Sequence, residues 1–334
     1  MTGQPTHAEE IAMALTSDDL MKAYRLMRTI RSFEESVFRD FERGQIPGFV
    51  HLYSGQEASA VGVCMHLRDA DKIGSTHRGH GHSIAKGVEV RGMMHEVFGR
   101  RDGLCGGKGG SMHIADLDKG MLGANAIVGG AAPLAVGAAL AAQRSGAGNV
   151  AVAFTGDGGS NQGTVFEAMN LAVVLKLPVI FIFENNGFGE GTGHDYAVGS
   201  RDIAGRAGAF GMPAVRVDGR DFFAVHAAAG DAVRRARGGG GPSAVETVAK
   251  RFGGHYTGDP MRYRTAVERE RTMLEDDPLK IFMSKTIASN QLRAEDLDAV
   301  DREVDVLIAA AAESAAKAPF PDGADLSTDV YVSY

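Results

Sequence analysis

Cysteine is scarce in this chain of 334 residues, which contains only Cys64 and Cys105. Two cysteines are too few for a disulfide scaffold, and neither has the paired Cys or His spacing of a zinc site, so we expect a reducing compartment. Basic residues are also in the minority, because 35 Lys and Arg stand against 42 Asp and Glu. The net charge of −7 predicts no general attraction to nucleic acid or anionic lipid, so an anionic ligand needs a local site.

Long apolar runs are missing as well. The run at residues 179–183 is far shorter than the roughly 20 residues that span a bilayer. The first 16 residues carry acidic side chains and lack the basic start and apolar core of a signal peptide. We therefore expect a cytoplasmic protein that does not associate with membranes.

Glycine, in contrast, is abundant, with 45 residues clustered at 103–110, 120–137, 156–163 and 187–193. Such clusters let the backbone approach a ligand closely or adopt positive φ. Flexible linkers are the alternative, but these clusters alternate with strongly apolar segments. The pattern therefore favours loops that bind a ligand.

The middle of the chain predicts the fold. Residues 149–154 and 178–183 are typical of buried strands, and residues 161–175 between them are typical of a helix. This βαβ unit implies parallel strands with a right-handed crossover. Further strand and helix patterns follow at residues 214–217, 222–237 and 243–249. We expect a doubly wound α/β fold with a mostly parallel sheet flanked by helices.

Helical patterns also occur toward both ends. Ser17, followed by two aspartates, predicts a capped helix that runs toward Gly44, and residues 131–142 predict an apolar, buried helix. Charged helical segments occupy residues 266–274, 279–289 and 294–316. The expected organisation is an N-terminal arm at residues 1–16, a main domain at 17–264, and a helical extension of that domain at 265–334.

Polar residues follow the two strands of the βαβ unit. Asp157 comes directly after the first strand and Asn186 directly after the second. Ligands bind at the carboxyl ends of parallel strands, and neighbouring strands are about 5 Å apart, so both side chains can reach one ion. Their hard oxygens suit magnesium bridging a diphosphate, and Gly158 and Gly159 let phosphate approach the helix that begins near Asn161. The carbonyl of Phe188 would complete the coordination sphere.

Each of these sequence elements alone is weak evidence for a magnesium and phosphate site, because Gly-Asp-Gly is commonly just a turn. The sequence does not match two other phosphate-binding motifs. Residues 105–109 lack the Ser or Thr after Lys that a P-loop requires, and residues 156–161 lack the third glycine of the dinucleotide fingerprint.

At this point the sequence resembles the alpha subunits of the thiamine-diphosphate-dependent pyruvate, branched-chain 2-oxo-acid and acetoin dehydrogenases. The resemblance covers residues 20–282. It rests on FVHLYSGQE at 49–57, THRGH at 76–80, GGKGGSMH at 106–113, NAIVG at 125–129, Gly156 to Gly158, and Asn185 with Asn186.

The resemblance implies a set of site residues. Asp157, Asn186 and the Phe188 carbonyl would hold magnesium, and Arg78 and His255 would reach the diphosphate. His77, Ala126, Val128, Gly158 and Gly159 would complete the cofactor site. Two of these depart from the family pattern, since His77 replaces a common Tyr and Ala126 a common Gly.

The role of each histidine is considered separately, because most histidines in a protein are not catalytic. His51, His80 and His255 lie in matching segments, and we expect catalytic or substrate contacts there. The alternative is a hydrogen-bonded pocket residue, and it applies equally to His113. The other histidines that we considered match no motif and are expected to be structural or exposed: His82, His95 and His226.

The implied reaction breaks a carbon–carbon bond next to a carbonyl and oxidises the resulting two-carbon unit onto a lipoyl group. A glutamate that activates the aminopyrimidine comes from a separate beta subunit, so we expect a heterotetramer served by a lipoyl-bearing acyltransferase. A ligand-binding relative without turnover and a self-sufficient decarboxylase or transketolase are the rival interpretations. The first is disfavoured by the retained metal ligands, and the second by the length of the chain.

Three segments resemble acetoin more than pyruvate dehydrogenases: residues 188–193, 207–213 and 255–260. In the loop at 250–260, Gly253 and Tyr256 replace a His and a Ser of pyruvate-using relatives, so regulation by phosphorylation is not carried over. We expect cleavage of acetoin, a neutral substrate, with oxidative decarboxylation of pyruvate or a branched 2-oxo acid as the alternative.

Overall fold

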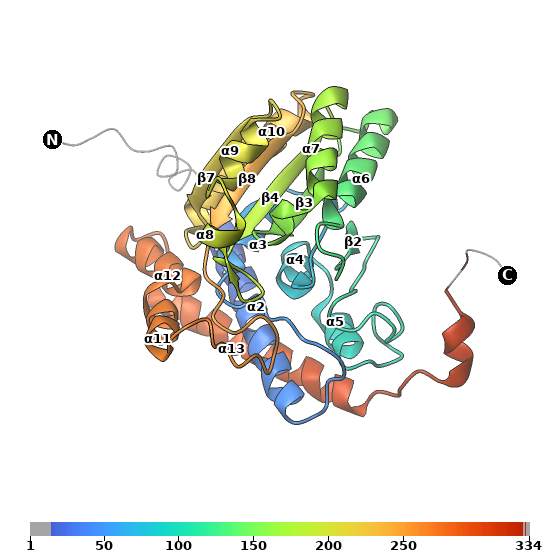
Figure 1. Ribbon diagram of the computed structural model, residues 1–334. Helices are drawn as coiled ribbons and strands as arrows, with labels where there is room; N and C mark the ends of the chain where they lie inside the picture. The colour runs from blue at the N-terminus through green and yellow to red at the C-terminus, as the bar shows by residue number, and fades with distance from the viewer. Residues whose placement is uncertain (1–14, 330, 332–334) are drawn as a thin grey trace.

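The computed structural model describes residues 15–329 and Tyr331, so the expected arm at residues 1–16 falls almost wholly outside the described part. A central parallel sheet with helices on both faces organises the chain (Figure 1). The order of its strands is β2-β1-β3-β4-β8-β7. The strands are β1 (Lys72–Gly74), β2 (Met121–Gly123), β3 (Ala151–Gly156), β4 (Val179–Asn185), β7 (Ala214–Asp218) and β8 (Ser243–Val248). The doubly wound α/β fold expected from the sequence is confirmed.

The two central strands bury side chains on both faces of the sheet. Val152 and Phe154 of β3 point into one apolar core, while Ala151 and Ala153 point into the other. This alternation follows from the period of two along a strand, and it explains why residues 151–154 of β3 and 179–183 of β4 are all apolar.

The first core lies under one layer of helices. This layer contains α2 (Ser17–Glu42), α3 (Glu57–Cys64), α4 (Gly79–Ala85), α5 (Val90–Val97), α10 (Phe222–Arg237), α12 (Pro278–Ala288) and α13 (Ala294–Lys317). The second core lies under α6 (Ala131–Ser145), α7 (Gly163–Leu175) and α9 (Ile203–Gly208). The remaining elements are α8 (His194–Ala197), α11 (Ala266–Glu275), the hairpin strands β5 (Phe188–Gly189) and β6 (Thr192–Gly193), and the 3-10 helices η1 (Gly159–Asn161) and η2 (Gly323–Ser327).

The start of α2 differs by one residue from the prediction. Thr16, not Ser17, caps the helix, because its hydroxyl accepts from the backbone of Asp19 while the Asp19 carboxylate accepts from Thr16. This reciprocal capping box needs an acidic side chain three residues after the cap, a spacing that Thr16 and Asp19 meet.

The expectation that residues 131–142 are buried all round is wrong for one face of α6. Leu134 is 49% exposed and Leu140 is 37% exposed, whereas Ala132, Ala135 and Ala139 pack on the sheet. A helix in an outer layer is covered on one side only, and alanines do not reveal which side that is. The α7 helix begins at Gly163, after a 3-10 turn at Gly159–Asn161, and not at Asn161 itself.

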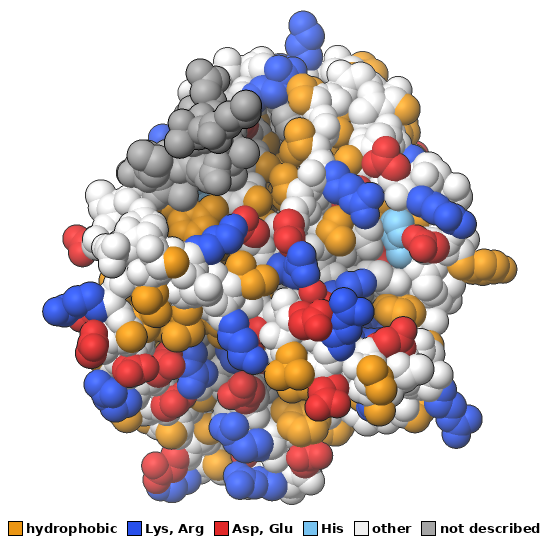
Figure 2. Space-filling model, turned by 90° about the vertical axis from the view of Figure 1, so that its left-hand side faces the viewer, with side chains coloured by type: hydrophobic (Ala, Val, Ile, Leu, Met, Phe, Trp, Pro, Cys, Tyr) orange, Lys and Arg blue, Asp and Glu red, His pale blue; other side chains and the backbone are white. Residues whose placement is uncertain are grey.

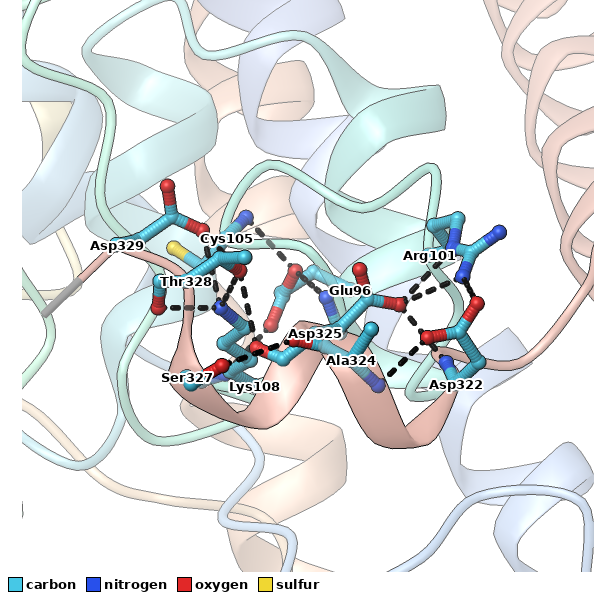
Figure 3. Close-up of polar contacts among 12 residues, drawn as sticks. Glu96, Arg101, Cys105, Lys108, Asp322, Ala324, Asp325, Ser327, Thr328 and Asp329 are labelled. Carbon is cyan, nitrogen blue, oxygen red and sulfur yellow. Dashed lines mark hydrogen bonds and ion pairs between the residues drawn. The ribbon is translucent and has the colours of Figure 1, made fainter. Parts of the chain in front are cut away.

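The C-terminal segment returns across a glycine-rich loop (Figure 3). Arg101 pairs with Asp322 and Asp325, and Lys108 donates to Thr328 and Asp329. Underneath, the buried Glu96 carboxylate accepts backbone N–H groups of the loop at Cys105, Gly107, Gly109 and Gly110. One carboxylate therefore shapes the loop from inside, while the C-terminal segment holds it from outside.

Acidic and basic side chains intermingle over the face shown in Figure 2. This face shows no continuous basic patch. None of the helices in the described residues has the length and apolar character needed to cross a membrane.

Candidate active site

A cavity of about 290 Å³ opens at the carboxyl ends of β1, β3 and β4, where an α/β sheet is expected to bind its ligand. Most of the site residues predicted from the sequence line it. They are His77, Arg78, Val128, Asp157, Gly158, Gly159, Asn186, Phe188 and His255. Three predicted residues, His51, His80 and Ala126, are not among the lining residues.

Asp157 follows the last residue of β3 and is 2% exposed. Its Oδ2 atom has no hydrogen-bond partner among the described residues. Burial raises the pKa of this carboxyl group, as expected for a carboxylate withdrawn from water. A divalent cation with a preference for hard oxygen would compensate the buried charge, so the residue fits a magnesium ligand.

Asn186 follows β4, which is the neighbour of β3. Gly156 and Glu184 lie opposite one another in the ladder between these strands, so Asp157 and Asn186 leave the sheet side by side. The Oδ1 atom of Asn186 accepts the backbone N–H of Phe188 at 3.3 Å, and its Nδ2 donates to Gln56 Oε1 at 3.2 Å. The side chain is thus held on both sides at the wall of the cavity.

Arg78 and His255 meet from opposite ends of the sequence. The Arg78 guanidinium donates to the carbonyls of Leu52 at 2.8 Å and His255 at 2.6 Å, and it lies 3.3 Å from His255 Nδ1. Burial, followed by the charge of Arg251, lowers the pKa of Arg78 to about 9. The two predicted phosphate-binding residues are therefore brought together at the wall of the cavity.

Three imidazole rings cluster beside Arg78. The ring centroids of His51, His77 and His255 are 4.6 to 5.2 Å apart. Burial, and then the charge of Arg78, lowers the pKa of His51 to about 3, that of His77 to about 2 and that of His255 to about 4. Their ligand atoms are close enough for a metal ion, but the neighbouring guanidinium groups make the cluster better suited to an anion.

Arg251 is a cavity residue to which the sequence assigned no role. Its guanidinium donates to the Phe188 carbonyl at 3.3 Å, the Glu190 carbonyl at 2.6 Å and the Tyr263 hydroxyl at 2.6 Å. Tyr263 in turn donates to Asp259, which accepts the backbone N–H of His255. Arg251 therefore ties the hairpin that carries Phe188 to the loop that carries His255.

Glu184 also lines the cavity, and its carboxylate accepts from Tyr53, Ser59 and His82. Although burial acts to raise the pKa of Glu184, the charge and hydrogen bond of His82 lower it. His82 also bonds Ser75, which lines the cavity. His82 is therefore a buried structural residue next to the site, one of the two alternatives expected for it.

His80 occupies a different position from the other predicted catalytic histidines. It is fully buried, with Nδ1 3.0 Å from Glu34 Oε2 and Nε2 2.9 Å from Ser111 Oγ. Glu34 also accepts the backbone N–H of Tyr53. Both ring nitrogens are engaged behind the wall of the cavity, which suits a residue that positions others.

Ala126, the remaining predicted cofactor residue outside the lining of the cavity, is exposed beside it.

Comparison with known proteins finds matches over nearly the whole chain. The family model described as "Dehydrogenase E1 component" matches residues 25–323. The chain is 54% identical to the alpha subunit of acetoin:2,6-dichlorophenolindophenol oxidoreductase from Cupriavidus necator, over 98% of each chain. It is 51% identical to the protein of the same description from Bacillus subtilis, over 96% of each chain. A pyruvate dehydrogenase E1 component alpha subunit from Rhizobium meliloti is 41% identical over 94% of this chain and 90% of its own length.

Proposed function

This chain belongs to the dehydrogenase E1 component family of thiamine-diphosphate-dependent oxidoreductases, and from that membership we propose that it is the alpha subunit of an acetoin dehydrogenase. The observation that carries the substrate assignment is the 54% identity, over almost the full length, to an acetoin oxidoreductase alpha subunit. The pyruvate dehydrogenase relative, at 41%, is more distant.

The proposed magnesium ligands are Asp157, Asn186 and the carbonyl of Phe188. The unpartnered, buried oxygen of Asp157 supports this assignment, because a bound cation would supply the missing partner. The cofactor, when bound, supplies the carbanion that cleaves the bond next to the substrate carbonyl. The chain itself holds the diphosphate end of that cofactor.

Arg78, His77 and His255 are the proposed diphosphate donors. Their ring or guanidinium groups border the cavity, and the low pKa values of the histidines keep them neutral near pH 7, able to donate one N–H each. Gly158 and Gly159 line the cavity and are proposed to contact phosphate through the backbone, and Val128 with Ala126 would support the body of the cofactor.

A catalytic role is proposed for His255, which lines the cavity, and a positioning role for His51, whose ring centroid lies 5.0 Å from that of His255. His51 lies behind the lining residues, so it would act on His77 and His255 as a neighbour. For His80, the bonds to Glu34 and Ser111 favour a positioning role in the same reaction.

A beta subunit is the proposed partner, in a heterotetramer that delivers its two-carbon unit to a lipoyl-bearing acyltransferase in the cytoplasm. The description of the relatives as alpha subunits supports the beta partner. Ile127 is 74% exposed and Val128 is 52% exposed at the rim of the cavity, so a partner that covers them would also close the site.

The physical distinction between acetoin and pyruvate is the carboxylate of pyruvate. A buried hydrogen bond to a charged group is worth about 1.5–3 kcal/mol, or roughly 10- to 150-fold in specificity. Gly253, where pyruvate-using relatives have a His, removes one such donor from the loop at 250–260.

The test is kcat/KM of the enzyme assembled with its beta subunit, measured for acetoin, pyruvate and branched 2-oxo acids with an artificial electron acceptor. We expect a preference for acetoin of at least about 10-fold. A preference for any 2-oxo acid would contradict the substrate assignment and leave the cofactor site standing.

A further inference from the structure

We propose that Gln56 is a positioning residue that orients the metal ligand Asn186 through its oxygen and donates its free amide hydrogen to the diphosphate. The inference rests on the proposed function, because it concerns the same magnesium and cofactor site. It adds a residue that lies in neither of the two loops that carry the proposed metal ligands.

The orientation of the two side-chain amides follows from one backbone group. The N–H of Phe188 can only donate, so the Asn186 atom that it meets at 3.3 Å must be the oxygen Oδ1. The other Asn186 atom is then Nδ2, which can only donate. Its partner at 3.2 Å must accept and is therefore Oε1 of Gln56. This leaves the Nε2 group of Gln56, a donor, on the other side.

That Nε2 atom is buried and has no hydrogen-bond partner in the described part of the chain. Gln56 is 1% exposed and lines the cavity together with Asp157, Asn186 and Arg78. A buried donor without a partner destabilises a fold, so we expect a ligand in this cavity to supply the acceptor. The anion expected next to the metal, a diphosphate, offers oxygens that can only accept.

The local structure keeps the side chain of Gln56 available for this role. Gln56 is the N-cap residue of α3, yet its side chain makes no capping hydrogen bond. The neighbouring Glu57 carboxylate instead accepts hydrogen bonds from the backbone N–H of Gly55 at 3.0 Å and from the Arg31 guanidinium at 2.6 Å. The polar groups around the start of α3 are thus engaged without Gln56, whose amide reaches across to the end of β4.

Gly55 fixes the path of the backbone just before Gln56. It has a φ of +97°, and a Cβ at this position would lie 2.1 Å from the Lys250 carbonyl oxygen. The segment before Gln56 therefore packs against the start of the loop that carries His255, where Phe252 N–H donates to the Ser54 carbonyl. Gln56 therefore lies between the loop at residues 250–260 and Asn186, which follows β4.

Two variants separate the two roles of the amide. Gln56→Met has a similar length but neither accepts nor donates, so both roles are lost. Gln56→Glu keeps an oxygen for Asn186 and replaces the free donor by a second carboxylate oxygen, which repels the diphosphate. Both are made in the full chain assembled with its beta subunit.

The readouts are the Kd of Mn²⁺ at saturating thiamine diphosphate, from electron paramagnetic resonance, and the Kd of thiamine diphosphate from calorimetry. For Gln56→Met we expect both affinities to fall about 10-fold, the lower end of the effect of losing a group that orients a metal ligand. For Gln56→Glu we expect unchanged Mn²⁺ affinity and at least about 10-fold weaker binding of thiamine diphosphate. This split is a result that general damage to the fold would not produce.

Gln143→Met is the matched control, because Gln143 is exposed on α6 and its amide donates to Leu175 and Lys176. Wild-type Mn²⁺ affinity in Gln56→Met, or wild-type cofactor affinity in Gln56→Glu, would overturn the proposal. Asp157→Asn separates this failure from that of the proposed function. If Asp157→Asn loses metal binding while both Gln56 variants behave as wild type, only the role of Gln56 is wrong.

Discussion

Gly158 and Gly189 touch backbone to backbone, so that a Cβ on Gly158 would lie 2.8 Å from the Gly189 Cα, and a Cβ on Gly189 2.9 Å from the Gly158 Cα. The first glycine follows Asp157 and the second follows Phe188, so this contact sets the spacing between two proposed metal ligands. Overpacking of this kind costs about 1–3 kcal/mol. We therefore expect Gly158→Ala to weaken magnesium-dependent binding of thiamine diphosphate by about 5- to 150-fold.

Calorimetry on the assembled variant measures this affinity, and the far-UV spectrum checks that the fold is retained. Gly193→Ala in β6 is the control, because a Cβ there meets nothing within 4 Å in the described residues. Equal cofactor affinity for Gly158→Ala and Gly193→Ala would show that the contact does not set the geometry of the site.

Arg251→Lys is expected to loosen the loop that carries His255. The planar guanidinium bonds Phe188, Glu190 and Tyr263 together, and a single ammonium group cannot reach all three. We expect at least about 10-fold weaker binding of thiamine diphosphate and faster proteolysis within residues 250–264. Limited proteolysis with and without cofactor measures the second effect. The exposed Arg262→Lys is the control, and equal cleavage rates for the two variants would refute the coupling.

The acid sensitivity of the cofactor-free protein is expected to depend on His77. Its folded-state pKa is about 2, lowered by burial and by Arg78, against an ordinary value of 6.5. Because the folded pKa is depressed, its contribution to stability is complete above pH 6.5 and is lost as the pH falls from there toward 2. The unfolded chain then binds one proton more, a slope of about 1.4 kcal/mol per pH unit.

His77→Tyr removes this proton uptake, so its free energy of unfolding should fall less steeply than that of the wild type between pH 6.5 and pH 5. Denaturant titrations at several pH values measure both slopes. Between pH 7 and pH 8 the two curves should run parallel, which serves as the internal control. Parallel curves over the whole range would mean that His77 is not held neutral by its surroundings.

Glu96→Gln is expected to destabilise the glycine-rich loop at residues 105–110. The carboxylate accepts four backbone N–H groups, two on each oxygen, and an amide nitrogen would turn a donor toward two of them. Leaving buried donors unpaired costs about 1–3 kcal/mol each, which predicts a loss of about 2–6 kcal/mol in the free energy of unfolding. Denaturant titration checks this, with the exposed Asp102→Asn as the control. A loss below about 1 kcal/mol would show that the loop does not depend on the carboxylate.

The sequence predicted the central fold well, because β3 and β4 each begin with a run of apolar residues and a segment of helical length separates them. It did not predict β1 and β2, which have three residues each and no pattern of their own. It also missed the exposed face of α6, since Leu134 and Leu140 can be assigned to a side only when the position of the sheet is known.

Within the site, the sequence predicted the proposed metal ligands but not two residues whose proposed roles depend on distant partners. Asp157 and Asn186 were predicted because they follow strands at the edge where ligands bind. Gln56 and Arg251 lie in motifs that were recognised, but their proposed roles follow from contacts with Asn186 and Phe188, 130 and 63 positions away. Only the folded chain shows such pairs.

The most direct test of the account is the binding of thiamine diphosphate to the assembled enzyme, measured by calorimetry with and without magnesium, for wild type and Asp157→Asn. We expect saturable binding that requires magnesium in the wild type and is lost in Asp157→Asn, while the far-UV spectrum and the association with the beta subunit stay unchanged. Unchanged cofactor affinity in an assembled Asp157→Asn enzyme would contradict the placement of the metal at Asp157 and the cofactor site built around it.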